Sequence, residues 1–224
     1  MSVQEIYDAL HTRYGDLNWW PSKTPYEVMV GAVLTQNTAW RNVEKAIAHF
    51  GGNLSPQAVL NMDVAELAET IRPAGFFNQK AVYLKAVTAW FAGYNFDVQA
   101  VRCEPLENIR AELLSLKGVG KETADSILLY AFGFPSFVVD AYTVRLCERY
   151  PIPLLGGVPE GRGGYAGKSY DAVKACFENN LPRDVETYNN FHATIVINAK
   201  EHCRKSKPLC NKCPLNGTCK KHGI

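Results

Sequence analysis

Residues 113–131 read LLSLKGVGKETADSILLYA, and this stretch decides the fold that we expect. Two apolar-rich segments with helical spacing flank the turn Lys117-Gly118-Val119-Gly120. Glycine permits a left-handed or crowded backbone and a close approach by a ligand. Because the second helix begins near Gly120, its free amide groups and the positive end of its dipole point at whatever occupies the turn. A nucleic-acid phosphate suits such a turn, although many helical hairpins also turn on glycine.

The rest of the chain predicts helices joined by short glycine and proline turns. Apolar residues recur at intervals of three and four, whereas alternating, strand-like runs are scarce. The expected helices cover residues 3–14, 25–35, 40–50, 64–71, 78–92, 105–115, 121–132 and 142–150, with two more between residues 169 and 200. The predicted fold class is therefore all-α. The glycine-rich segment 156–168 is expected to be a connector and not a P-loop, because Arg162 stands where that loop needs glycine.

Composition limits the environment in which the protein works. With 224 residues, of which 47% are hydrophobic, the chain can bury one sizeable core or two small ones. The net charge of +2 does not by itself predict a polyanionic partner. The sequence shows no leader-like segment and no apolar stretch long enough to cross a bilayer. We therefore expect a location in the reducing cytoplasm and no membrane partner.

Four cysteines near the end of the chain form the second informative motif. They follow the spacing Cys203–x6–Cys210–x2–Cys213–x5–Cys219, with lysine and arginine between them. Four thiolates suit either an iron–sulfur cluster or tetrahedral zinc. Zinc sites usually use two close pairs of ligands, and only Cys210 and Cys213 form such a pair, so the cluster is favoured. Two disulfides are the alternative, but they are rare in a reducing cytoplasm.

The hairpin and the cysteine spacing together resemble endonuclease III-like DNA glycosylases, the helix-hairpin-helix-GPD superfamily. The resemblance covers about residues 3–219 and implies a [4Fe–4S] cluster on the four cysteines of residues 203–219. It also implies a monomer of two helical lobes, acting at the nucleoid of a bacterium or archaeon. One lobe is expected to be a six-helix barrel over residues 24–134 that contains the hairpin 113–131. The other is expected to combine residues 1–23 with residues 135–224.

An aspartate about twenty residues after the hairpin is the expected catalytic group. Asp140 follows the apolar run Phe137-Val138-Val139 and stands at the start of the next predicted helix, where an N-cap role is expected in any case. Amide donors at a helix start hold a carboxylate ionised. In the superfamily the matching aspartate carries catalysis. An ionised carboxylate facing the sugar can stabilise an oxocarbenium-like transition state as the base departs.

The helix after the glycine turn distinguishes two types of reaction. Bifunctional members of the superfamily carry a lysine within Gly-Val-Gly-Arg-Lys-Thr-Ala, and its amine forms a Schiff base that leads to strand cleavage. This chain has Glu122 at the lysine position and Lys121 one residue earlier, which rotates the side chain by about 100°. A monofunctional enzyme that uses water is therefore expected. Two alternatives remain: Glu122 is only a favourable charge in the first turn, or Lys121 reaches the sugar in a bifunctional glycosylase/lyase for oxidised pyrimidines.

Residues 18–40 resemble the bacterial 3-methyladenine DNA glycosylase III branch, although the branch member compared lacks the four-cysteine motif. In that branch aromatic side chains sandwich the damaged base, and in the superfamily a glutamine fills the gap that the flipped base leaves. By position, the wall residues are Trp19, Trp20, Pro21 and Trp40, and the glutamine is Gln36. N-alkylated purines carry a positive charge that strengthens stacking on aromatic rings. The resemblance thus implies 3-methyladenine or a similar base as the substrate.

Damaged double-stranded DNA is the implied partner, with the target base flipped out of the duplex. The residues expected to contact its backbone are Gly118, Gly120, Lys121, Lys80, Arg204, Lys205 and Lys207. A non-catalytic DNA-binding protein with a structural metal is the alternative from another class of function. His192, Lys200 and His202 precede the first cluster cysteine, and the sequence assigns them no chemistry.

Overall fold

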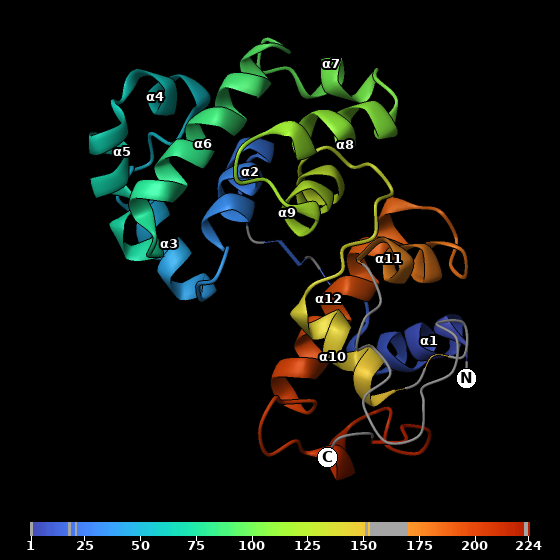
Figure 1. Cartoon of the computed structure of the whole chain (residues 1–224). Helices are drawn as coiled ribbons and strands as arrows, with labels where there is room; N and C mark the ends of the chain where they lie inside the picture. Colours follow the sequence, from blue (N-terminus) through green and yellow to red (C-terminus); the bar gives the residue numbers. More distant parts are fainter. Residues whose placement is uncertain (1, 18, 21, 151, 153–169, 222–223) are drawn as a thin grey trace. The chain divides into compact units, whose positions relative to one another are not determined.

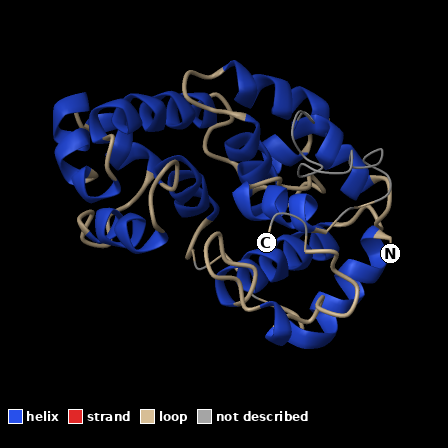
Figure 2. Ribbon diagram, turned by 60° about the horizontal axis from the view of Figure 1, so that its bottom comes forward, coloured by secondary structure: helices blue, strands red, loops and turns tan. Residues whose placement is uncertain are grey.

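The computed structural model describes residues 2–17, 19–20, 22–150, 152, 170–221 and 224 (Figure 1). Every regular element in these ranges is helical, as Figure 2 shows, which confirms the predicted all-α class. In chain order the elements are α1 (Val3–Tyr14), α2 (Pro25–Leu34), α3 (Trp40–Ala48), α4 (Pro56–Asn61), α5 (Val64–Thr70), η1 (Arg72–Ala74), α6 (Phe77–Ala92), α7 (Val98–Arg102), α8 (Leu106–Ser115), α9 (Lys121–Ser126), η2 (Ile127–Ala131), α10 (Ala141–Arg149), α11 (Tyr170–Glu178), α12 (Val185–Glu201) and η4 (Cys210–Lys212).

The predicted helices differ from the observed ones at a few places. The short helices α4 and α7 were not expected, because five or six residues show too little periodicity to be recognised. The helix predicted over residues 121–132 changes its winding at Ile127 into the π-helical turn η2, in which the Phe132 amide donates to the Ile127 carbonyl, five residues back. The predicted connector 156–168 lies outside the described residues. Within the described chain, no helix has the length and apolarity that crossing a bilayer requires.

The chain divides into two compact units, which we name after their main features. The hairpin lobe is Trp20–Phe134, and the Asp140 lobe combines Met1–Trp19 with Pro135–Ile224. The hairpin lobe is therefore one continuous segment, whereas the Asp140 lobe is built from the two ends of the sequence.

The helix α2 forms the centre of the hairpin lobe. Thr24 caps its first turn by accepting a hydrogen bond from the Glu27 amide, and Pro25 occupies the first helical position. Beyond that turn nearly every side chain is apolar, from Val28 to Leu34, and all of these residues are buried. A helix that is apolar on all sides must be covered on all sides. The helices α6 and α9 and the turn η2 all pack against it.

The helix α12 is the corresponding centre of the Asp140 lobe. Both α1 and α10 pack against it, although α1 stands at the opposite end of the sequence (Figure 1). Ser2 and Glu5 form a reciprocal capping box at the start of α1. The buried side chains of α1 are Val3, Ile6 and Leu10, whose spacing places them on one face of the helix. Burying each of them contributes about 1.5–3 kcal/mol.

Candidate functional site

The glycine turn of the hairpin lobe connects α8 to α9. Gly118 has φ +86°, a value that L side chains rarely adopt, and a Cβ atom there would lie 2.1 Å from the Tyr83 ring. Gly118 is therefore required both by its backbone conformation and by the packing of Tyr83. Gly120 differs, because its backbone is extended and no heavy atom lies within 4 Å of the position that a Cβ would take. It is exposed, caps α9 without any side-chain hydrogen bond, and leaves open space beside the turn.

A buried ion pair braces the two helices of the hairpin. Arg110 on α8 donates through Nε and Nη2 to the two carboxylate oxygens of Asp125 on α9, at 2.9 and 3.1 Å. The Asp125 side chain is fully buried and Arg110 is 20% exposed. Two parallel hydrogen bonds fix orientation as well as distance. The pair therefore sets the angle at which α9 leaves the glycine turn.

Gln36 is joined to the same turn. Its Nε2 atom donates to the Gly118 carbonyl and to Thr123 Oγ1, both at 2.9 Å. The side chain thus connects the end of α2 with the hairpin. The role predicted for Gln36, filling the gap left by a flipped base, stays a prediction.

Lys80 has an unexpected position. Its side chain is 2% exposed, and Nζ donates to the carbonyls of Leu34, at 2.8 Å, and Ala74, at 2.7 Å. Burial lowers the pKa of its ammonium group to about 8. Both acceptors lie inside the lobe, so this conformation does not offer the ammonium group to a phosphate. Lys80 instead ties the last carbonyl of α2 to the turn before α6.

Two indole rings of the hairpin lobe lie over Gly31, and a third aromatic ring, that of Tyr130, packs against one of them. Trp20 and Trp40 meet edge to face with ring centroids 5.6 Å apart, and Trp20 lies 4.8 Å from the Tyr130 ring. A Cβ at Gly31 would lie 3.2 Å from Trp40 and 3.4 Å from Trp20, so the absence of a side chain permits this arrangement. Sandwiching a base would need about 7 Å between two rings, twice the contact distance of about 3.5 Å. A base would therefore stack on the outside of the Trp20–Tyr130 pair or separate its rings.

The structure brings together two of the four predicted wall residues. These are Trp20 and Trp40, and the indole N–H groups of both are buried without a hydrogen-bond partner among the described residues. Buried donors usually have partners, so these two groups have capacity for a ligand or water. Trp19 belongs to the Asp140 lobe, where Lys200 Nζ lies 5.4 Å from its ring centroid. Pro21 lies outside the described residues.

Asp140 caps the first turn of α10, as predicted. Its Oδ1 atom accepts hydrogen bonds from the amides of Tyr142 and Thr143, at 2.9 and 2.7 Å, and from Thr143 Oγ1 at 3.0 Å. Its Oδ2 atom lies 3.5 Å from Nε2 of His192 on α12, and the Asp140 side chain is 12% exposed. Burial favours the neutral acid, but the His192 ring and the Thr143 donors outweigh it and hold the pKa of Asp140 below its usual range. The structure thus presents an ionised carboxylate in one orientation.

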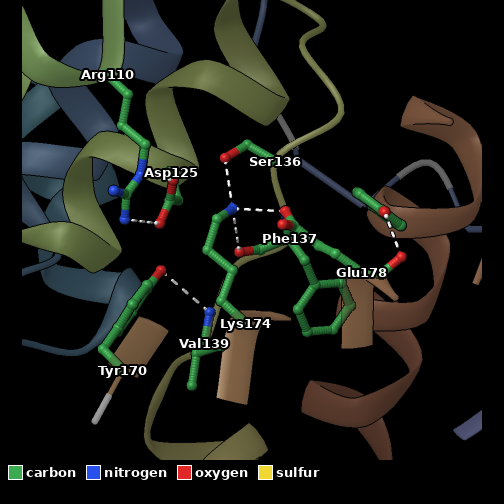
Figure 3. A network of polar contacts seen from close by, with 9 residues as sticks. Arg110, Asp125, Ser136, Phe137, Val139, Tyr170, Lys174 and Glu178 are labelled. Atoms are coloured by element: carbon green, nitrogen blue, oxygen red, sulfur yellow. Dashed lines mark hydrogen bonds and ion pairs between the residues drawn. The ribbon is translucent and has the colours of Figure 1, made fainter. Parts of the chain in front are cut away.

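One face of α11 fixes the segment that leads into Asp140 (Figure 3). The Val139 amide donates to the Tyr170 hydroxyl at 3.3 Å, and Lys174 Nζ donates to Ser136 Oγ at 2.6 Å and to the Phe137 carbonyl at 3.2 Å. One turn further, Glu178 accepts from the Phe137 amide at 2.9 Å and pairs with Lys174 at 2.7 Å. Residues four apart lie on one side of a helix. These three polar residues of α11, which we call the α11 row, therefore hold residues 136–139.

Glu122 and Lys121 occupy the first turn of α9, and both side chains are exposed. A negative charge is favourable at that position of any helix. Their predicted roles in the reaction and at the DNA backbone stay predictions.

The cysteine loop is anchored to α10 by two arginines that the sequence does not single out. Arg145 Nε donates to the Cys203 carbonyl at 2.8 Å, and Arg149 donates to the carbonyls of Arg204 and Lys205 at 2.6 and 3.2 Å. Arg149 also donates to Cys203 Sγ at 3.3 Å. The side chains of Arg204, Lys205 and Lys207 are exposed. The helix that starts at Asp140 thus also positions the basic loop.

The four cysteines lie near enough to influence one another. Burial first, and then the charges of the other cysteines, raise the pKa of Cys213 and Cys219. In the described chain no group of three or more His, Cys, Asp or Glu side chains is arranged to hold a metal ion. The donor set itself, four half-buried sulfur atoms with an arginine N–H beside one of them, has the chemistry that a thiolate-bound iron–sulfur centre requires.

Phe76 is a further feature that the sequence does not single out. Its side chain is 67% exposed, and its φ of +48° is unusual for a bulky residue. It stands directly before α6, after Gly75. Its exposed ring is available to a binding partner.

The glycine turn between α8 and α9, the all-helical fold and the capping aspartate Asp140 are together typical of helix-hairpin-helix proteins that bind DNA. The model of the HhH-GPD superfamily of base excision DNA repair proteins matches residues 30–153. The chain therefore belongs to this superfamily, and the resemblance to endonuclease III-like glycosylases is confirmed.

Similar proteins agree with this assignment. A Methanocaldococcus jannaschii protein with the provisional name of a DNA repair glycosylase is 48% identical over 221 residues, which are 97% of this chain and 95% of that protein. The Aeropyrum pernix thymine-DNA glycosylase is 28% identical and covers 92% of this chain and 87% of its own. The H. pylori 3-methyladenine DNA glycosylase bound to 1,N6-ethenoadenine has a TM-score of 0.72 at 27% identity, covering 90% and 98%. A non-covalent endonuclease III–DNA complex has the same fold, with a TM-score of 0.77 at 24% identity over 99% and 96%.

Proposed function

We propose that the protein is a monofunctional DNA glycosylase of base excision repair. In this proposal it binds double-stranded DNA as a monomer, receives a flipped damaged base and hydrolyses the N-glycosidic bond of that base. The substrate class is an N-alkylated purine such as 3-methyladenine. The observation that carries the proposal is the Asp140 carboxylate, which is fixed in orientation and kept ionised at the start of α10.

Asp140 acts in this proposal through its negative charge. As the bond between C1′ and the base nitrogen lengthens, positive charge develops on the sugar, and the carboxylate stabilises that charge. The base leaves with the electron pair of the broken bond, and an N-alkylated purine, cationic before the break, leaves as a neutral molecule. A water oxygen forms the new bond to C1′, and Asp140 accepts the proton that this water loses. The products are a free base and an abasic site.

The monofunctional form of the reaction is supported by Glu122. A carboxylate cannot form an imine with the sugar, so no covalent intermediate arises at this position. In the bifunctional alternative Lys121 reaches C1′, displaces the base and leads to strand cleavage. Several relatives are named endonuclease III, and the experiment below therefore also tests the bifunctional reaction.

The substrate class is supported by the rings above Gly31. In this proposal a cationic base stacks on the electron-rich rings of Trp20 and Trp40, outside the Trp20–Tyr130 pair or after its rings separate. Trp19 and Pro21 remain part of this proposal as further wall residues. The H. pylori neighbour carries the name of a 3-methyladenine glycosylase, whereas the A. pernix relative is named for thymine. Electron-rich rings attract a cationic base, and this favours an N-alkylated purine over neutral thymine as the substrate.

DNA contacts in this proposal come from two groups of exposed or half-buried residues. The first group lies on the hairpin lobe, where Gly118, Gly120 and Lys121 receive a phosphate, Gln36 fills the gap in the duplex, and the exposed ring of Phe76 wedges between bases. The second group is the basic loop with Arg204, Lys205 and Lys207, which gives affinity without reading sequence.

A [4Fe–4S] cluster held by Cys203, Cys210, Cys213 and Cys219 is also part of the proposal. When bound, such a cluster supplies four iron–thiolate bonds that cross-link the loop. Arg145 and Arg149 already hold the loop backbone from α10, so the cluster would complete its anchoring. The loop then presents its basic side chains from a rigid base.

The test is a panel of duplexes that each contain one lesion, including 3-methyladenine, 1,N6-ethenoadenine, thymine glycol and a G·T mismatch. Released bases are identified by mass spectrometry, and the same reactions are run with borohydride to trap imines. We expect release of an alkylated purine and no trapped adduct, with release by Asp140→Asn reduced by about 10³-fold. A trapped adduct would establish the bifunctional reaction. Binding to every duplex without base release would identify a non-catalytic DNA-binding protein and overturn the proposal.

A further inference from the structure

A second polar side chain lies beside the Asp140 carboxylate. His192 stands on α12, and its Nε2 atom is 3.5 Å from Asp140 Oδ2. The His192 side chain is 7% exposed and the Asp140 side chain is 12% exposed, so little water reaches either group. A polar contact between two largely buried groups is stronger than the same contact in solvent.

The two oxygens of the carboxylate have different surroundings. Oδ1 accepts three hydrogen bonds from the first turn of α10, which exceeds the two lone pairs of one oxygen. Oδ2 takes part in none of these bonds and is the oxygen that faces His192. The oxygen with capacity left for a water molecule or the sugar is therefore Oδ2, and its neighbour is the imidazole ring.

The helix α12 holds His192 in a fixed direction. The ring of the preceding residue, Phe191, packs edge to face on Tyr7, at 5.2 Å, and on Phe137, at 5.9 Å. Asn190 accepts a hydrogen bond from the Leu17 amide at 2.9 Å. Because neighbouring residues of α12 are locked on other sides of the helix, α12 cannot rotate about its axis without losing these contacts. The imidazole ring therefore stays on the side of Asp140.

We propose that His192 is a positioning residue for the reaction assigned to Asp140, with its Nε2–H directed at Oδ2. The three bonds at Oδ1 act as a pivot, and the ring fixes the remaining rotation of the carboxylate. It thereby sets the direction of the oxygen that meets the water molecule and the developing positive charge. This inference rests on the proposed function, since it assigns His192 a part in that same reaction.

Two substitutions separate positioning from packing. His192→Gln keeps an N–H donor at nearly the same reach, whereas His192→Leu fills similar space without a donor. The measurements are the single-turnover rate of base release with enzyme in excess, the Kd for a duplex with an uncleavable abasic-site analogue, and the unfolding temperature. A misplacement of a reacting group by about 1 Å can cost about 100-fold in rate, and loss of a residue that orients a metal ligand costs about 10- to 100-fold.

We expect His192→Leu to lower the single-turnover rate by about tenfold or more. The Kd should change little, the variant should remain folded at the assay temperature, and His192→Gln should recover most of the rate. A rate in His192→Leu equal to that of the wild type would overturn the proposal. An equal loss of rate in both variants would also overturn it, since it would show that the ring matters for packing and not as a donor.

A second measurement does not depend on activity. Unfolding free energies of His192→Leu, Asp140→Asn and the double variant form a double-mutant cycle that isolates the interaction between the two side chains. We expect the two single effects not to add up in the double variant, and strict additivity would overturn the contact. If the wild type releases no base from any duplex, the proposed function fails, and this cycle still decides whether His192 and Asp140 are coupled.

Discussion

The first-turn amides of α9 and α10 have no partner within their own helices. Only α10 begins with a residue whose side chain accepts hydrogen bonds from these amides. At Gly120 no side chain caps α9, the residue is exposed, and the space that a side chain would take there is open. At Asp140 the carboxylate itself accepts from the amides of α10, and the side chain is largely buried. An open helix start attracts an anion from outside, whereas a capped one stabilises an anion that the chain supplies. The hairpin lobe is therefore suited to holding a phosphate and the Asp140 lobe to supplying a charge.

The strongest test of this comparison removes the charge and keeps the cap. In Asp140→Asn the amide oxygen can still accept from Tyr142 and Thr143, but no negative charge faces the sugar. We expect base release to fall by about 10³-fold, a loss typical of removing one electrostatic group from a transition state. Single-turnover kinetics measure the rate, and the Kd for lesion duplex should stay within a few-fold of that of the wild type.

The rate of the wild type should also persist in mild acid. The pKa of Asp140 lies below its usual range, so the carboxylate stays ionised at pH values where an ordinary aspartic acid becomes protonated, near pH 4. Base release that declines well above that pH would contradict the assignment of Asp140 as the ionised group.

The open helix start is tested by two matched glycine substitutions. Gly118→Ala places a Cβ in the Tyr83 ring and in an unfavourable backbone region, so we expect a loss of about 2–4 kcal/mol in the free energy of unfolding. Gly120→Ala meets no atom and should cost less, about 0.5–1 kcal/mol, because alanine is a poorer N-cap residue than glycine. Urea denaturation measures both.

The two glycine variants also separate stability from DNA binding. Gly120→Ala should weaken binding to duplex DNA, because its methyl group occupies the space that a phosphate would enter. Unchanged binding in this stable variant would show that the phosphate does not approach the turn there.

The α11 row, which holds the segment before Asp140, provides the next test. Lys174→Met removes the donor to Ser136 and Phe137 and leaves Glu178 without its ion pair, so we expect a loss of about 2 kcal/mol in unfolding free energy. Lys45→Met changes an exposed lysine and serves as the control. If the row positions Asp140, the single-turnover rate falls as well, even at temperatures where Lys174→Met is fully folded. An unchanged rate would limit the row to a structural role.

The smallest effect concerns the buried ammonium of Lys80 in the hairpin lobe. Its pKa is lowered to about 8, whereas the unfolded chain keeps the ordinary value near 10.5. Between these two pH values the unfolded chain binds a proton that the native protein lacks, so unfolding free energy rises with pH in this window. The difference between the wild type and Lys80→Met should therefore shift by about 1 kcal/mol in favour of the wild type from pH 8 to pH 9. A difference independent of pH would contradict the lowered pKa.

Local signals in the sequence predicted much of the fold. Apolar spacing indicated the longer helices, paired glycines indicated the hairpin, and the N-cap role of Asp140 followed from its place after an apolar run. All of these depend on residues that are close in sequence. The short helices α4 and α7 and the π-helical turn at Ile127 depend on packing, and their sequences carry too few residues of regular pattern.

The surroundings of the site could be predicted less well. Lysine is usually solvated, so nothing local indicated that Lys80 is buried against two carbonyls. Tyr170, Lys174 and Glu178 are visible in the sequence as polar residues four apart, a pattern that most helices show on a solvent face. His192 meets Asp140 only because α10 and α12 pack together. Such contacts between distant segments are set by the tertiary structure alone.

The pairing of α1 with α12 has a consequence for how the protein is made. A ribosome releases the apolar face of Val3, Ile6 and Leu10 before residues 20–134, and the helix that covers it, Val185–Glu201, only after them. The continuous segment Trp20–Phe134 is complete long before then. During this interval the first helix remains uncovered and open to chaperones or to self-association. Slow translation after residue 134 should therefore reduce the yield of folded protein more than slow translation before it.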